Sequence, residues 1–154
     1  MPCPYTPSPS ALALLGHFEG CRLLAYLPTP HDRPTIGWGS TQHADGRPVR
    51  LGERWSQAEA NAHRDRDVAA FGASVAQLIG DAPTTQSQFD ALVVLAYNIG
   101  VSGLAGSTLL RLHKAGDFAG AAAAFAAWRF QAGRPLPGLV RRRAAEAALY
   151  RGEA

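Results

Sequence analysis

Cysteine, long apolar runs and dense basic clusters are all scarce in this sequence. Cys3 and Cys21 are the only cysteines, too few for a disulfide scaffold, so two free thiols are expected. No run approaches the roughly 18 uncharged apolar residues of a membrane span. The opening MPCPYTPSPS has neither the basic nor the apolar segment of a signal peptide, so synthesis in the cytoplasm is expected. Arg141–Arg143 is the only dense basic run, which argues against a nucleic-acid partner despite the net charge of +3.

What is present fits one globular domain of the α+β class. The chain has 154 residues, of which 47% are hydrophobic and 18% charged, a composition that excludes a disordered chain. Residues 1–10 are predicted to form an N-terminal tail and residues 11–154 a single domain. Within that domain, a small antiparallel sheet lobe is expected over about 20–52, and a larger helical lobe over about 56–151.

Local signals mark the first elements. Ser8 followed by Pro9 is typical of a helix start, and Gly20 ends that predicted helix after about Glu19. The segments RLLAYL and TIGWGS are β-prone, and Asp45-Gly46 is a tight-turn signal. The sequence therefore predicts a sheet of two or three strands directly after a short helix.

The rest of the chain is predicted to be helical. Two capping boxes open helices, Ser56–Glu59 for a helix to about Phe71 and Thr85–Gln88 for a core-facing helix that Gly100 ends. Shorter helices are expected over about 106–115, 118–129 and 138–151. The alanine-rich stretch AGAAAAFAAW keeps a helical spacing of large residues, which indicates close helix packing.

Glu19 is the first candidate for chemistry. It lies where a helix ends, a position that is electrostatically unfavourable for a carboxylate, and it follows the apolar Phe18. Cleavage of a glycosidic bond needs an acid that keeps its proton near neutrality, and burial beside apolar side chains favours the protonated form. The alternative from the sequence alone is a surface carboxylate at a helix end.

The chain resembles the phage-type lysozymes, the endolysins of glycoside hydrolase family 24. The similarity rests on EGCRLLAY…TIGWGST, on QFDALVVLAYNIGVSGLAGSTLLRLHKAGDFAGAA, on Trp128 and on LPGLVRRRAAEAAL, and it covers roughly residues 11–151. It implies a lysozyme-like α+β fold and hydrolysis of the β-1,4 bond between N-acetylmuramic acid and N-acetylglucosamine in bacterial peptidoglycan, with lysis of the host cell. It further implies no cofactor, no stable membrane association, a monomer, and release to the periplasmic wall through a partner holin.

The resemblance also implies catalytic roles. Glu19 matches the family's general acid, and Thr35 matches the threonine that helps to hold the attacking water. The family places an Asp, or sometimes a Cys, nine positions after the Glu, where this chain has Pro28. The separation between Glu19 and Thr35 is one residue longer than usual, so this loop carries an insertion.

Three interpretations of the missing group remain open. Asp32 can polarise the water, in which case an inverting reaction would require its carboxyl group about 6.5–9.5 Å from that of Glu19. Alternatively, Thr29 or Thr35 holds the water without a carboxylate. In the third, His31 or a distant residue serves, or activity is impaired. The alternative functions are a lytic transglycosylase acting on the same bond and a catalytically degraded protein that binds cell wall.

Three further residues are predicted to bind substrate. Trp38 can stack on a sugar ring, and Asn98 falls where the family places an amide that faces the saccharide. Arg142 is the arginine chosen from Arg141–Arg143 to steady the acid; the alternative is a solvated basic face. The five histidines show no metal-ligand spacing, so no metal is expected.

Overall fold

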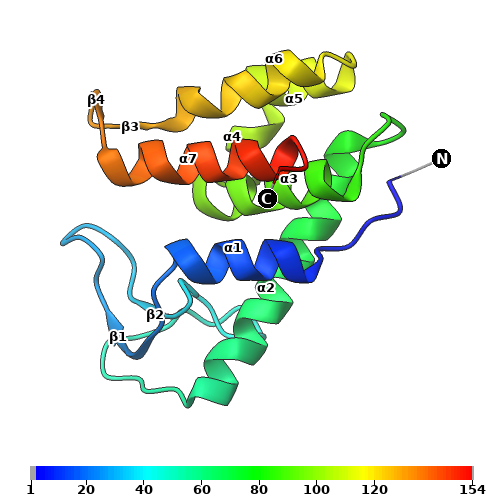
Figure 1. Ribbon diagram of the computed structural model, residues 1–154. Helices are drawn as coiled ribbons and strands as arrows, with labels where there is room; N and C mark the ends of the chain where they lie inside the picture. The colour runs from blue at the N-terminus through cyan, green and yellow to red at the C-terminus, as the bar shows by residue number, and fades with distance from the viewer. Residues whose placement is uncertain (1–2, 154) are drawn as a thin grey trace. The chain divides into compact units, whose positions relative to one another are not determined.

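The computed structural model describes residues 3–153, and the chain divides into two compact units. One unit is continuous in sequence, Leu15–Ala69, and the other combines the residues up to Leu14 with those from Ala70 onward. Both boundaries fall inside helices, α1 (Pro9–Phe18) and α2 (Gln57–Ile79). The continuous unit carries a two-stranded sheet and the other is mainly helical (Figure 1), which confirms the α+β class.

The continuous unit is built around the antiparallel pair β1 (Arg22–Tyr26) and β2 (Thr35–Gly37). Arg22 pairs with Gly37 and Tyr26 with Thr35, with an irregularity between them because five residues face three. A small core packs beside the pair and consists of Ala25, Ile36, Val49, Trp55 and Ala60. This core is local, since all of its members lie within 36 residues of one another.

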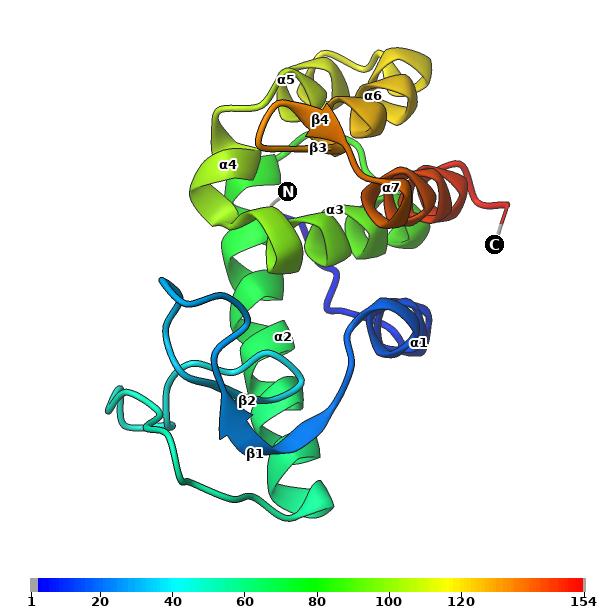
Figure 2. The ribbon, with the colours of Figure 1, turned by 90° about the vertical axis from the view of Figure 1, so that its left-hand side faces the viewer.

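The other unit is organised around α3 (Gln86–Ile99). All nine residues from Gln88 to Ala96 are buried, so this helix is covered on every side rather than on one face only. It packs against α7 (Pro137–Tyr150), which lies beside it in both views (Figures 1 and 2). The remaining helices are α4 (Val101–Ala105), α5 (Thr108–Lys114), α6 (Phe118–Ala124) and the 3₁₀ helix η1 (Phe125–Trp128). Within the described residues, no helix has the length and apolar character needed to cross a membrane.

The helix-start signals are confirmed. The Thr85 side chain accepts a hydrogen bond from the Gln88 N–H, and the Gln88 side chain accepts one from the Thr85 N–H. Ser56 and Glu59 form the same reciprocal pair at the start of α2. Asp117 caps α6 by accepting from the Gly120 N–H. These contacts join residues three apart, so the local sequence is sufficient to specify them.

Several predicted boundaries are wrong. Helix α2 continues to Ile79 rather than ending near Phe71. The end of α1 at Phe18, by contrast, agrees with the prediction to within one residue. The predicted helices 106–115 and 118–129 are shorter, since α5 starts at Thr108 and α6 changes to 3₁₀ geometry at Phe125. The chain after residue 56 is also not wholly helical, because β3 (Phe130–Gln131) and β4 (Arg134–Pro135) form a hairpin.

The N-terminal segment before α1 is held by hydrogen bonds within its own unit. Ser8 donates through both its N–H and its hydroxyl to the carboxyl group of Asp90, which is 1% exposed. The Gln86 amide donates to the backbone oxygen of Thr6. Pro7 lies against Gly72, where an added Cβ would approach the proline ring to 2.7 Å. Glycine at 72 therefore makes room for this segment on α2.

Candidate active site

Glu19 occupies the junction between α1 and β1. Its N–H donates to the Leu15 oxygen at 2.7 Å, which extends the helical hydrogen bonding by one residue beyond Phe18. The side chain is half-buried. The backbone of this candidate acid is therefore fixed by α1, three residues before the start of β1 at Arg22.

Thr35 is the first residue of β2 and is 6% exposed. Its hydroxyl donates to the Arg33 oxygen at 3.0 Å. Because the hydroxyl proton is used in this bond, the Oγ1 atom remains available only as a hydrogen-bond acceptor. This arrangement suits a group that orients a water molecule by accepting one of its protons.

Asp32 lies in an exposed turn with Thr29. The Asp32 N–H donates to the Thr29 oxygen at 3.1 Å, and the Thr29 hydroxyl donates to Asp32 Oδ2 at 3.0 Å. Pro28, at the family position of the second carboxyl group, and His31 are exposed in the same loop. The turn thus brings together Thr29 and Asp32, two of the alternatives for holding water, and leaves Oδ1 of Asp32 without a contact to Thr29.

Trp38 follows β2 and is half-buried against the small core. Its indole N–H donates to Asn61 Oδ1 at 2.8 Å, and the Arg64 guanidinium carbon lies 5.3 Å from the ring centroid. The indole is therefore held in orientation by α2. Gly37 beside it is buried rather than open to a ligand, and an added Cβ there would lie 3.3 Å from the Trp55 ring.

Asp67 on α2 supports the same unit. Partial burial raises the pKa of its carboxyl group, and the Ser40 hydroxyl, which donates to Oδ2 at 2.9 Å, opposes this effect. Ser40 follows the segment that carries Trp38, and its N–H and C=O both bond to Ile36. The Ser40–Asp67 hydrogen bond therefore connects the β2 turn to α2.

Asn98 and Arg142 belong to the helical unit. Asn98 is exposed near the end of α3, and its Oδ1 accepts from Arg143 Nη2 at 2.9 Å. Arg142 is 6% exposed and donates from Nε to Glu146 Oε2 at 3.2 Å. Arg142 is therefore not part of a solvated basic face.

Sequence reasoning missed Arg143 and Glu146 as parts of this network. Arg143 Nη2 donates to Glu146 Oε2 at 2.9 Å, and Arg143 Nε lies 2.8 Å from Glu146 Oε1. Both residues are at most 1% exposed, and burial raises the pKa of Glu146 to about 7 against the pull of the two guanidinium groups. Glu146 follows Arg142 by four residues and Arg143 by three on α7, and this spacing is the signal that could have indicated ion pairing.

No disulfide contributes to the residues around Glu19 or to the network around Glu146, since Cys3 and Cys21 are both free thiols. This confirms the expectation from the sequence. The Cys21 sulfur lies 3.5 Å from the side-chain nitrogen of Gln57 at the start of α2.

Comparisons with known proteins agree on one family. The family model described as phage lysozyme matches residues 16–146. The chain is 37% identical over 147 residues to an endolysin of Acyrthosiphon pisum secondary endosymbiont phage 1, covering 93% of this chain and 96% of that one. Several other endolysin relatives are longer, and this chain spans little more than half of their length.

Solved structures are similar over almost the whole chain. An endolysin from Escherichia coli O157:H7 phage FAHEc1 has a TM-score of 0.85 at 36% identity, with 97% of this chain and 96% of that chain covered. The muramidase domain of SpmX from Asticaccaulis excentricus has a TM-score of 0.82 at 33% identity, with 95% and 98% covered. The agreement therefore extends beyond the motif around Glu19 to the fold.

Proposed function

Since this chain belongs to the phage lysozyme family, we propose that Glu19 is its catalytic acid and that the bond cleaved is the β-1,4 linkage from N-acetylmuramic acid to N-acetylglucosamine. The chain is a lysozyme-type glycoside hydrolase, and its substrate is bacterial peptidoglycan. The observation that carries the assignment of Glu19 is its position: a half-buried carboxyl group, fixed by α1, directly before the strand pair that contains Thr35.

In the proposed reaction, Glu19 donates its proton to the glycosidic oxygen as the bond to the sugar carbon breaks. A water molecule attacks that carbon, and its proton passes to an acceptor. Asp32 Oδ1 is the proposed acceptor, with the Thr29 hydroxyl fixing Oδ2. Thr35 accepts a hydrogen bond from the same water, because its own proton is bound to the Arg33 oxygen. Hydrolysis of this kind leaves a reducing sugar end.

Trp38 and Asn98 are proposed to bind the saccharide. The indole N–H is bound to Asn61 and the Arg64 guanidinium lies over the ring, so the sugar is proposed to contact the part of the ring that these residues and the small core leave accessible. Arg143 occupies Oδ1 of Asn98, so the amide hydrogens on Nδ2 are oriented to donate to an acetamido or hydroxyl oxygen. Arg142, which is buried with Glu146, would act indirectly by holding this network in place.

The decisive experiment is Glu19→Gln, which keeps the shape of the side chain and removes the transferable proton. Clearing of a suspension of exposed cell walls should slow by about 10²–10⁴-fold, the usual contribution of a general acid. Glu153→Gln, the same change at an exposed position, is the matched control and should leave the rate unchanged. Undiminished lysis by Glu19→Gln would refute the assignment.

Asp32→Asn separates the alternatives for the second group. If the Asp32 carboxylate accepts the proton from water, activity should fall by about 10²-fold or more. Full activity of Asp32→Asn together with loss of activity in Thr35→Val would instead indicate that the Thr35 hydroxyl holds the attacking water without a carboxylate. Each variant is compared with Asp65→Asn, a carboxyl group on the exposed side of α2.

A second candidate reaction is lytic transglycosylation, which Pro28 favours because it offers no carboxylate at the family position. In that reaction the sugar's own hydroxyl attacks, and the product carries a 1,6-anhydro muramic end. Mass spectrometry of the digested wall distinguishes the two reactions, since hydrolysis leaves only reducing ends. Wall binding without any product would indicate a degraded site.

The family membership also supports a proposal for where the enzyme is made and where it acts. We propose that the enzyme is made in the cytoplasm of the bacterial host and reaches the periplasmic wall with the help of a holin. We also propose that it acts as a monomer. Sedimentation of the purified protein tests the monomer, and lysis of cells that express it with and without a holin tests the release.

A further inference from the structure

A buried carboxyl group in the helical unit is connected to an exposed amide through a single arginine. Glu146 on α7 is completely buried and Arg143 beside it is 1% exposed, whereas Asn98 on α3 is exposed. Arg143 Nη2 donates to Glu146 Oε2 and to Asn98 Oδ1, both at 2.9 Å. One guanidinium nitrogen therefore links the buried carboxyl group to the amide at the surface.

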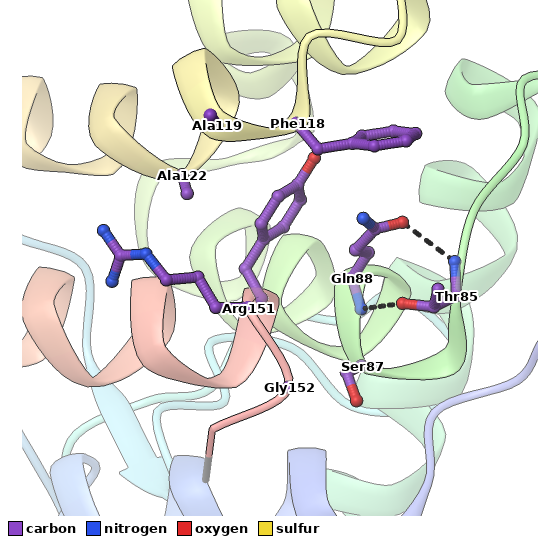
Figure 3. Close-up of a pocket in the computed structure, with 9 residues that line it drawn as sticks. Thr85, Ser87, Gln88, Phe118, Ala119, Ala122, Arg151 and Gly152 are labelled. Carbon is purple, nitrogen blue, oxygen red and sulfur yellow. Dashed lines mark hydrogen bonds between the residues drawn. The ribbon is translucent and has the colours of Figure 1, made fainter.

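The backbone of Asn98 is fixed by the rest of α3. The helix is capped at its start by the reciprocal hydrogen bonds of Thr85 and Gln88 (Figure 3), and the nine residues from Gln88 to Ala96 are all buried. The pocket drawn in Figure 3 lies at this capped end of the helix, and Asn98 does not line it. What remains to be set at the other end of α3 is the rotation of the Asn98 side chain.

Arg143 decides which end of the Asn98 amide faces away from it. A guanidinium group only donates hydrogen bonds, so the amide atom that it contacts must be the oxygen. The two hydrogens on Nδ2 are then directed away from Arg143 and can donate to the carbonyl oxygen of a sugar acetamido group. Without this contact, a half-turn about the last torsion of the side chain would present the amide oxygen instead, which such a carbonyl cannot pair with.

Glu146 holds the Arg143 guanidinium in the orientation that this contact requires. Its two oxygens face two nitrogens of the same guanidinium group, Oε2 at Nη2 and Oε1 at Nε, the latter pair 2.8 Å apart. A two-point contact of this kind fixes the plane of the guanidinium group as well as its distance. Arg142 Nε also donates to Oε2 at 3.2 Å, so two cations share this carboxyl group.

We propose that Glu146 is a positioning residue for saccharide binding, which acts through Arg143 to keep the amide hydrogens of Asn98 directed outward. The inference rests on the proposed function, in which Asn98 binds the saccharide. Glu146 itself is completely buried, so it cannot touch the substrate. Its effect is therefore expected on the affinity for the saccharide and not on proton transfer by Glu19.

The charge of Glu146 should control this effect. Burial raises the pKa of its carboxyl group to about 7, and the charged groups that oppose this shift are Arg143 and Arg142. Helices α6 and η1, which pack against α7, carry no ionisable side chain. The other ionisable side chains on α7 and on α3, which also packs against it, are Arg141, Tyr150, Asp90 and Tyr97. Protonation of Glu146 removes the charged partner of the guanidinium group and weakens its hold on the amide, so saccharide affinity should be lower below pH 7 than above it.

The test measures binding of a tetrasaccharide of alternating N-acetylglucosamine and N-acetylmuramic acid by isothermal titration calorimetry. All proteins carry Glu19→Gln, so that cleavage does not accompany binding and Glu19 does not titrate. At about pH 8.5, where Glu146 is ionised, Glu146→Gln should raise the Kd by about three- to tenfold. The reason is that glutamine offers Arg143 one acceptor oxygen and turns an N–H donor toward the other guanidinium nitrogen.

Asp90→Asn is the matched control for a loss of structure. Asp90 is a buried carboxyl group on the same helix as Asn98, is 1% exposed, and accepts hydrogen bonds from Ser8 and Gln86. Its replacement should lower stability and leave the Kd for the tetrasaccharide unchanged.

Two further readouts separate positioning from a loss of structure. The Kd should fall as Glu146 ionises, with its titration followed by the NMR shift of the carboxyl carbon, and the part of the pH dependence that follows this titration should be absent from Glu146→Gln. In a double-mutant cycle, Glu146→Gln should add little to the loss caused by Asn98→Ala, because both changes remove the same contact with the saccharide.

Unchanged affinity of Glu146→Gln, an equal loss in Asp90→Asn, or losses that add fully in the double variant would overturn the proposal. A Kd that stays constant while Glu146 titrates would overturn it as well. Unchanged affinity of Asn98→Ala would contradict the proposed saccharide contact of Asn98, and the inference with it. Loss of affinity in Asn98→Ala without loss in Glu146→Gln therefore concerns Glu146 alone.

Discussion

A buried relay of hydrogen bonds connects α7 to α5 and to the loop before α3. The Thr84 hydroxyl donates to the Ala82 oxygen at 2.9 Å, so it can only accept from His113 Nε2, which lies at 2.8 Å. His113 therefore carries its proton on Nε2, and its Nδ1 accepts from the Tyr150 hydroxyl at 2.6 Å. His113 is fully buried and Tyr150 is 3% exposed. Each polar atom of the imidazole has one partner in this relay.

Tyr150→Phe is expected to destabilise the protein although it removes a single oxygen. The ring and its contacts with Phe125 and His113 are kept, but Nδ1 of His113 loses its donor. A change of tautomer cannot repair this, because Nδ1–H would then face the same gap. Leaving one buried acceptor unpaired costs about 1–3 kcal/mol. In a chain of this size each kcal/mol lowers the Tm by about 2–4 °C.

Urea unfolding followed by circular dichroism measures this loss. Tyr5→Phe is the control, because Tyr5 also has a ring contact, with Phe89, and its change should stay within about 0.5 kcal/mol. A loss below about 0.5 kcal/mol for Tyr150→Phe would refute the reasoning. The pH dependence gives a second check, since burial lowers the pKa of His113 below its ordinary 6.5. The stabilisation by neutral His113 is complete above pH 6.5 and falls as the pH drops through the folded-state pKa.

Three further predictions follow from the buried and strained positions. Glu146 has a folded-state pKa raised from 4.5 to about 7, so its contribution to stability falls as the pH rises through this interval. The free energy of unfolding of Glu146→Gln, relative to that of the unaltered protein, should therefore increase by about 3 kcal/mol from pH 4.5 to pH 7, as measured by thermal unfolding. A relative decrease over this interval would instead mean that the two arginines hold the pKa of Glu146 low. Ser40→Ala should cost about 1 kcal/mol and raise the pKa of Asp67 further, as measured by NMR titration, since its hydrogen bond stabilises the ionised carboxylate. An unchanged titration of Asp67 would contradict this. Ala132, with φ of 53°, is the only non-glycine residue with positive φ in the described chain, so Ala132→Gly should stabilise the β3–β4 hairpin by up to about 1 kcal/mol in urea unfolding, while a loss would show that the turn is not strained.

The features that the sequence predicted well are local ones. The capping boxes at Ser56–Glu59 and Thr85–Gln88, and the helix stop at Gly100, depend on residues within one helical turn. The hairpin at β3–β4 was missed because its two-residue turn is Ala132-Gly133, and alanine is not a usual residue at positive φ. The end of α2 was missed because the helix continues through Gly72, the glycine that follows the predicted end at Phe71, and ends only before Gly80.

The residues of the candidate site are predictions from the sequence, and the contacts that they make could not be derived from it. Glu19 and Thr35 were found through short motifs, but the bond from Thr29 to Asp32 depends on the conformation of a loop with an insertion. Glu146 was not singled out from the sequence, yet it is completely buried. Its partner Arg143 also binds Asn98, 45 positions earlier in the chain, and pairings at such separation leave no local pattern.

The order in which the ribosome makes the chain has a consequence for the N-terminal segment. Ser8 must wait for Asp90, 82 residues later, before its hydrogen bonds can form. At about 5–20 residues per second, this delay is roughly 4–16 s. During that time the stretch Leu15–Ala69 is complete and can condense around Trp55, while the flanking residues remain without their partners. A nascent chain stalled near residue 80 would therefore contain a folded Leu15–Ala69 unit between two segments of the other unit that have not yet folded.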